Sequence, residues 1–174
     1  MSQIASVILP GRGDTDVLLH SFATRMLAKG LRVRGLVQIN AARTDGQKYD
    51  MDVQVLPDGA AFRISQALGQ GARGCRLNSE ALELSVAAVA ATVRDGADLF
   101  ILNKFGKQEA EGRGYRHLLA DVVSMGIPVL VGLNALNREA FYHFAGDYAQ
   151  PCPPTLRALE RWAAAISRQD CTAA

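Results

Sequence analysis

The chain has 174 residues, a hydrophobic content of 49%, a charged content of 21% and a formal net charge of +2. These values are typical of a globular protein with one full core, so we expect residues 1–174 to form a single domain. The small net charge gives no reason to expect nucleic acid as a partner. No apolar run approaches the roughly 20 residues that a membrane span needs.

The cysteines and the first residues indicate the compartment. The chain has 3 cysteines and no CxxC pair, which speaks against a disulfide framework and against a zinc site. The first residues lack the basic region and the long apolar core of a signal peptide. We therefore expect a cytoplasmic protein, and we predict neither a metal site nor a cofactor.

The hydrophobic pattern predicts strands and helices that alternate along the chain. In chain order it predicts a strand at 3–9, a helix at 14–29, a strand at 33–39, a polar loop at 43–50 and a β-hairpin over 51–65 with its turn at 57–59. There follow a glycine-rich loop at 66–78, a helix at 79–94, a strand at 98–103, a helix at 113–125, a strand at 127–132, a short helix at 137–145, a connector at 146–155 and a final helix from Leu156.

The strands outside the hairpin are apolar on both faces. This pattern indicates an α/β fold, in which helices cover both sides of a mostly parallel sheet and the hairpin is an insertion or an edge. In such sheets ligands bind at the carboxyl ends of the strands, where helices begin. The site is therefore expected in the loops at 10–16, 40–51, 66–78, 103–113 and 133–137.

Three glycine–arginine turns lie in these loops, each before a predicted helix. Residues 11–13 and 112–114 both read Gly-Arg-Gly, and a third turn contains Arg73 and Arg76. A helix start favours anions, glycine lets the backbone approach a ligand, and a guanidinium suits an oxyanion. Their convergence on one edge predicts an anion site. For any single turn, the alternative is that the glycines end a loop and the arginine is solvated.

The first turn departs from the phosphate-binding P-loop, G-x-x-x-x-G-K-[ST]. Gly13-Asp14-Thr15 occupies the place of G-K-[ST], so a carboxylate stands where the lysine belongs, and the loop is shorter. Such a loop can hold one oxyanion but is too short to wrap two phosphates. We interpret Asp14 as the N-cap of the next helix, and Asp16 as a charge that matches the helix dipole.

The strand at 98–103 delivers Asn103 and Lys104 at its end. At this place a nucleotide hydrolase needs carboxylates or a glutamine, which hold Mg²⁺ and position water. An amide and a protonated lysine supply neither function. With Lys107 and Arg113 the loop instead gains positive charge, so the sequence predicts the place of a phosphate site, no catalytic residue and no hydrolysis.

The order of these segments resembles a bacterial family of unknown function that is related to small P-loop nucleoside triphosphatases. The resemblance covers about residues 4–165 and is most specific at 103–114, which reads NKFGKQEAEGRG. This stretch resembles the segment that carries Asp-Glu in the hydrolases, with Asn103 and Lys104 in place of the carboxylates. The resemblance implies a P-loop-NTPase-like three-layer sandwich with a mostly parallel sheet and a β-hairpin insertion. It also implies an association with molybdate transport.

We therefore predict a site for a small anionic ligand, namely molybdate, phosphate or a nucleotide. Its residues are expected to be Gly11, Arg12, Gly13, Thr15, Asn103, Lys104, Lys107 and Arg113, with Arg73 and Arg76 as secondary candidates. Arg12, Lys104 and Arg113 should line one pocket, because the strands before their loops, at 3–9 and 98–103, are expected to be neighbours. In the alternative geometry Lys104 turns inward, pairs with Asp14 and fills the pocket.

Three functions are consistent with such a site. The first is a non-hydrolytic binding protein for a small oxyanion or a phosphorylated ligand, linked to molybdate handling. The second is a nucleoside-triphosphate-binding enzyme with displaced catalytic groups, and the third is a degenerate domain that binds a protein partner. The missing P-loop lysine and carboxylates favour the first over an enzyme, and the sequence leaves a homo-oligomer open.

Overall fold

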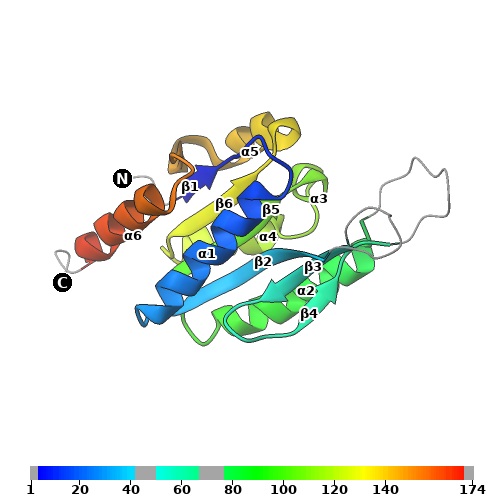
Figure 1. Cartoon of the computed structure of the whole chain (residues 1–174), viewed down its shortest axis with the longest axis horizontal. Helices are drawn as coiled ribbons and strands as arrows, with labels where there is room; N and C mark the ends of the chain where they lie inside the picture. Colours follow the sequence, from blue (N-terminus) through cyan, green and yellow to red (C-terminus); the bar gives the residue numbers. More distant parts are fainter. Residues whose placement is uncertain (1–3, 42–49, 67–76, 171–174) are drawn as a thin grey trace.

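The computed structural model describes residues 4–41, 50–66 and 77–170, whose strands form one sheet (Figure 1). The strands are β1 (Ile4–Val7), β2 (Val33–Ala41), β3 (Asp50–Val55), β4 (Ala61–Arg63), β5 (Leu99–Phe105), β6 (Val129–Leu133) and β7 (Ala149–Pro151). Their order in this 7-stranded sheet is β4-β3-β2-β5-β6-β1-β7. Neighbours from β2 to β7 pair in parallel, whereas β3 and β4 form an antiparallel hairpin at one edge. This confirms the predicted α/β fold, and the arrangement is consistent with a P-loop-like fold.

Helices cover both faces of the sheet and complete three layers (Figure 1). They are α1 (Asp14–Ala28), α2 (Ser79–Val93), α3 (Lys107–Ala110), α4 (Arg116–Ser124), α5 (Arg138–Ala145) and α6 (Leu156–Asp170), with 3₁₀ turns at Ala135–Asn137 and Gly146–Tyr148. One core layer packs the sheet against α1 and α6, and the other packs it against α2, α4 and α5. None of the described helices combines the length and the apolar character needed to cross a membrane.

β5 shows why the apolar runs form inner strands. Phe100 and Leu102 lie in the core layer of α2, whereas Leu99 and Ile101 lie in the core layer of α1. Successive side chains of a strand point to opposite faces, so a run without polar alternation needs a cover on each face. All four side chains are at most 2% exposed, as the sequence pattern predicts.

The expectation that the strands at 3–9 and 98–103 are neighbours was wrong. β6 lies between β1 and β5, and Val129 of β6 is in register with Ile4 on one side and with Phe100 on the other. All five residues of β6 are buried. Strands that are buried on both faces lie in the interior of a sheet, and β6 accordingly lies between β1 and β5.

Two further segments differ from the prediction. The connector at 146–155 contains β7, which extends the sheet beyond β1. β5 continues to Phe105 with a register shift after Leu102, so Asn103 and Lys104 lie within the strand. Short edge strands and register shifts contain too few residues to produce a hydrophobic period, so the sequence pattern does not indicate them.

Both edges of the sheet are short strands. β4 has 3 residues, and its Arg63 donates from Nε to Oδ1 of Asp52 in β3 at 3.0 Å. β7 also has 3 residues and ends in Pro151, which has no main-chain N–H to donate. The long strands of the sheet therefore lie inside it.

Replacing Val129 by aspartate tests the sheet arrangement, because this side chain is 0% exposed. An unpaired carboxylate in the core costs on the order of 5 kcal/mol, which matches the whole stability of many domains. We expect Val129→Asp to lose the cooperative thermal transition seen by circular dichroism. Leu136→Asp, at a side chain that is 92% exposed, is the matched control. An unchanged melting temperature for Val129→Asp would contradict the buried position of β6.

Candidate functional site

A pocket of about 450 Å³ lies at the start of α1, at the carboxyl edge of the sheet. We call it the α1 pocket. The turn after β1 and the first turn of α1 contribute Gly11, Arg12, Gly13 and Thr15, and β5 contributes Lys104. The structure thus brings together five of the predicted ligand residues from two distant parts of the chain.

The turn before α1 ends at Gly13, which is the N-cap of the helix and has a φ of 85°. This left-handed φ favours glycine. The interpretation of Asp14 as the N-cap was wrong, because Asp14 is the first helical residue and no side chain caps the helix. The Asp14 carboxylate folds over Gly11, where an added Cβ would lie 1.8 Å from Oδ2. The turn therefore carries a negative group of its own.

Thr15 ties the turn to the end of β1. Its Oγ1 accepts a hydrogen bond from the main-chain N–H of Leu9 at 3.1 Å, and the residue is 7% exposed. A hydroxyl is one donor as well as an acceptor. Thr15 can therefore stabilise the turn and still donate its hydrogen to an acceptor in the pocket.

Asp16 is a buried part of the site. It was expected to be a charge that matches the helix dipole, yet it is 3% exposed. Its Oδ2 accepts a hydrogen bond from Nδ2 of Asn40 at 2.6 Å, and its Oδ1 lies 3.7 Å from Nζ of Lys104. Lys104 thus pairs with Asp16 and not, as in the predicted alternative, with Asp14. The sequence contains no signal for this role, because Asp16 and Asn40 meet only through the packing of α1 on β2.

Lys104 and Arg12 are cations that line the α1 pocket. The side chain of Lys104 is 33% exposed, and its 3.7 Å distance from Asp16 exceeds that of a hydrogen bond. Its ammonium hydrogens are therefore available to a ligand. Arg12 is exposed and forms no ion pair within the described part of the chain. Both side chains can turn toward an anion without breaking a short contact.

Asn103 does not line the α1 pocket, although it lies close to Thr15; it lines a separate pocket between the hairpin and α2. It is 1% exposed, and among the described residues neither atom of its amide has a hydrogen-bond partner. Its Oδ1 lies 3.4 Å from where a Cβ on Gly132 would be, and a methyl group of Thr15 lies 3.2 Å from the same point. An unsatisfied buried polar group costs about 1–3 kcal/mol. The amide is therefore a polar group that a bound molecule could satisfy.

Glu109 holds the loop after β5 in place. Its Oε2 accepts a hydrogen bond from the N–H of Gly106 at 2.8 Å, and its Oε1 accepts one from the N–H of Tyr115 at 3.0 Å. Burial raises the pKa of this carboxyl, and the two hydrogen bonds act in the opposite direction. Among the described residues no group of three His, Cys, Asp or Glu side chains could together hold a metal ion.

The remaining predicted cations lie elsewhere. Lys107 Nζ is 3.6 Å from Oε1 of Glu111, and Arg113 pairs with Oε2 of the same carboxylate. Neither residue lines the α1 pocket, so the structure brings Arg113 and Lys107 together with Glu111 and not with the turn after β1. Arg73 and Arg76 lie outside the described residues.

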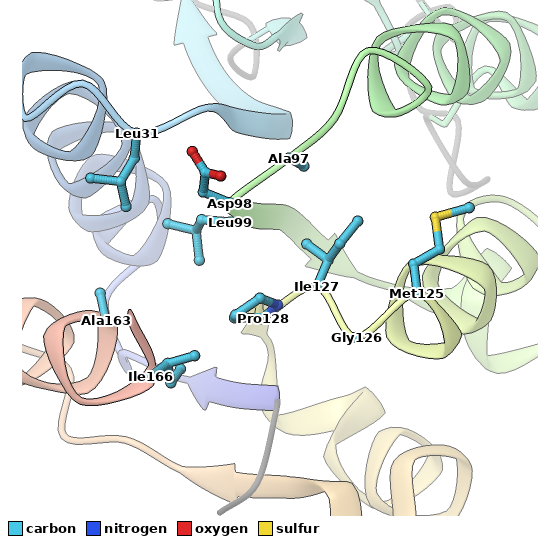
Figure 2. Close-up of a pocket in the computed structure, with 10 residues that line it drawn as sticks. All are labelled: Leu31, Ala97, Asp98, Leu99, Met125, Gly126, Ile127, Pro128, Ala163 and Ile166. Atoms are coloured by element: carbon cyan, nitrogen blue, oxygen red, sulfur yellow. The ribbon is translucent and has the colours of Figure 1, made fainter. Parts of the chain in front are cut away.

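A second pocket, of about 460 Å³, lies at the amino ends of β5 and β6, and so at the opposite edge of the sheet (Figure 2). Most of the side chains that line it are apolar, and they include Leu31, Leu99, Ile127 and Ile166. Asp98 in its wall accepts a hydrogen bond from Nη2 of Arg32 at 2.6 Å, which holds the pKa of Asp98 below its usual value. No cationic side chain is among the residues that line this pocket, and its carboxylate is already paired, so we place the candidate anion site in the α1 pocket.

The parallel sheet, and a pocket at the start of the helix that follows β1, define a P-loop-like α/β protein. The chain belongs to the family described as protein of unknown function (DUF2478), whose model matches residues 4–162. This finding confirms the resemblance to a family of unknown function that the segment at 103–114 indicates.

A named relative is the molybdenum import ATP-binding protein ModC 2 of Bradyrhizobium diazoefficiens, with 34% identity over 161 residues. The match covers 92% of this chain and 18% of that protein, so the chain spans less than a fifth of its relative. The relative's name agrees with the implied relation to P-loop nucleoside triphosphatases. No solved structure matches the chain.

Replacing Glu109 by alanine tests whether this carboxylate is structural. The change leaves two main-chain N–H groups without their acceptor, so we expect the free energy of unfolding to fall by about 2 kcal/mol. The measurement is urea unfolding at neutral pH. Glu111→Ala, at an exposed carboxylate in the same loop, is the matched control and should have a much smaller effect.

The pH dependence of the free energy of unfolding is a second measurement of whether Glu109 is structural. Because the pKa of Glu109 is raised in the fold, the folded state binds more protons than the unfolded state between the two pKa values. The contribution of Glu109 to stability should therefore fall as pH rises through this window. Glu109→Ala should lack that contribution, and identical pH profiles of wild type and variant would contradict the assignment.

Proposed function

We propose that this protein is a non-hydrolytic binding protein for a small oxyanion or a phosphorylated ligand, held in the α1 pocket. The observation that carries the proposal is that Arg12 and Lys104, from distant parts of the sequence, line one pocket at the start of a 15-residue helix. A guanidinium, an ammonium and a helix start are all groups that bind oxyanions.

The protein's own acids set the strength of binding. An anion must compete with Asp16 for Lys104, and it must approach the turn over which the Asp14 carboxylate lies. A dianion attracts the two cations more strongly than a carboxylate does. The pocket therefore favours a doubly charged oxyanion, and binding should weaken as salt screens the exposed Arg12.

Molybdate is the first candidate ligand. It is a tetrahedral dianion, and the name of the relative links a homologous stretch to molybdenum import. Phosphate and phosphorylated molecules share this oxyanion chemistry. Titrations with molybdate, phosphate and ATP–Mg²⁺ distinguish these ligands. We place the protein in the cytoplasm, in agreement with its cysteine pattern.

Alanine at Arg12 or at Lys104 should weaken molybdate binding about tenfold, because a charge-assisted contact contributes about 1.5–3 kcal/mol. Calorimetric titration at fixed salt measures the effect. Arg113→Ala and Lys107→Ala are the matched controls, because both side chains pair with Glu111 outside the pocket.

The binding affinities of these four variants decide which cations contact the anion. An equal loss in Arg113→Ala would restore the sequence-based prediction that Arg113 shares the site. Wild-type binding that Arg12→Ala and Lys104→Ala both leave unchanged would place the anion site elsewhere on the molecule.

The protein should show no turnover of ATP or GTP. Asp14 stands in the place of the P-loop lysine, and Asn103 and Lys104 stand where hydrolases have carboxylates. Phosphate release is the measurement, with Asn103→Ala as the matched control. Steady release by the wild type above that of the variant would count against a non-hydrolytic function.

Two alternatives give other results in the same titrations. A nucleoside-triphosphate-binding enzyme with displaced catalytic groups would bind ATP–Mg²⁺ and hydrolyse it. A domain that binds a protein partner would be silent with all three ligands. The relative supports this second alternative, because there the homologous stretch is 18% of a much longer import protein.

A further inference from the structure

A third pocket, of about 210 Å³, lies between the hairpin, α2 and the loop that contains α3. We call it the hairpin pocket. One wall consists of apolar side chains of β2, β3, the segment after β4 and the region of α2, namely Leu36, Met51, Val53, Ile64, Leu77 and Leu82. Most of them belong to the core layer of α2, so the pocket continues that core toward the surface.

The opposite wall is polar, and two of its charged side chains, Glu109 and Lys107, are engaged by the protein itself. Glu109 lines it, and its carboxylate is engaged by the main-chain N–H groups of Gly106 and Tyr115. Lys107 pairs with Glu111. Lys104 also lines this pocket, but its Nζ lies 3.7 Å from Oδ1 of Asp16, a residue of the α1 pocket. A charged ligand would therefore exchange its hydration for a mainly apolar lining, which costs several kcal/mol.

Asn103 lines this pocket with both atoms of its amide unsatisfied, and Gln108 is a second amide of the wall that has no partner among the described residues. It is 9% exposed, it lines the pocket, and its side-chain amide forms no hydrogen bond within the described residues. A glutamine amide presents a donor and an acceptor side by side. It therefore matches a ligand edge that presents an acceptor beside a donor.

We propose that the hairpin pocket binds a small, uncharged nitrogen heterocycle whose edge carries a hydrogen-bond donor beside an acceptor, as adenine does. The volume is below the roughly 300–1,000 Å³ of sites for larger ligands, which fits one or two fused rings. The apolar wall packs against the face of the ring. Gln108 bonds to its edge in the bidentate manner by which amide side chains contact adenine in nucleic acids.

This inference is independent of the anion site. The hairpin pocket lies on the α2 side of the sheet and the α1 pocket on the α1 side, with Lys104 in the wall of each. Of these two pockets Arg12 lines only the α1 pocket, so loss of oxyanion binding in the Arg12→Ala variant leaves the heterocycle site to be tested by itself.

The methionines provide a test in one spectrum. Met51 lines the hairpin pocket, Met125 lines the pocket of Figure 2, and Met26 lies in the core layer of α1. Adenine is titrated into the full chain with ¹³C-labelled methionine methyl groups. We expect a saturable shift of the Met51 signal, with the Met26 and Met125 signals unchanged.

Gln108→Leu keeps the size of the side chain and removes its hydrogen bonds, so it should weaken adenine binding about fivefold to tenfold. Gln54→Leu is the matched control, because Gln54 lies between the buried Val53 and Val55 in β3 and so points to the other face. If Gln108→Leu does not fold, Leu77→Trp at the half-buried rim should fill the pocket and abolish the Met51 shift.

A parallel titration with AMP distinguishes a free base from a base that is part of a nucleotide. A Met51 shift with both compounds supports a ring that enters the pocket while its sugar phosphate stays in solvent, and a shift with adenine alone supports the free base. The absence of a Met51 shift up to the solubility limit of adenine, a shift confined to Met125, or equal affinity of Gln108→Leu and wild type would each overturn the proposal.

Discussion

The pairing of β6 between β1 and β5 sets the spacing of the two chain segments that bring Arg12 and Lys104 to the candidate anion site. The turn after β1 and the end of β5 are held one strand apart, on either side of β6. Gly132 of β6 then sets how closely α1 approaches, because a Cβ there would lie 2.7 Å from Leu19 Cδ1 and 3.4 Å from Asn103 Oδ1. A larger residue would push the helix off the sheet and open the pocket floor. The geometry of the site is thus a consequence of how one central strand packs.

The charges around the α1 pocket compensate one another. Arg12 and Lys104 stand against Asp14 and Asp16, and Asn40 donates a further hydrogen bond to Asp16. A group of like charges without counterions would repel and destabilise the fold in the absence of a ligand. The two acids offset the two cations, and they make any anion that binds a competitor of the protein's own carboxylates.

The sequence predicted the elements of this fold better than their mutual positions. Apolar runs and helical periods are local, so the inner strands and the long helices, including α1 and α2, were found close to their observed bounds. That Arg12 and Lys104 meet followed from the rule that loops at the carboxyl ends of parallel strands share an edge.

The contacts that depend on tertiary packing could not be predicted from the sequence. Asp16 resembles an ordinary surface acid in the sequence, because the residues next to it in the chain do not indicate its contacts with Asn40 and Lys104. Arg113 was expected to reach the turn after β1, but Glu111, two residues away, provides a nearer partner. The expected neighbourhood of β1 and β5 was wrong for a similar reason, since β6 and β1 are both short and apolar and either fits beside β5.

The two edge strands determine how this protein can associate with others. A free sheet edge is a place where another strand can add. Here β4 presents 3 residues braced by the Arg63–Asp52 pair, and β7 presents 3 residues that end in a proline. Neither offers a length of regular backbone on which an incoming strand could build a ladder. Assembly with a partner, or with a second copy of the chain, is therefore directed to the helix faces and the loops, where side chains and not main-chain hydrogen bonds decide which surfaces match.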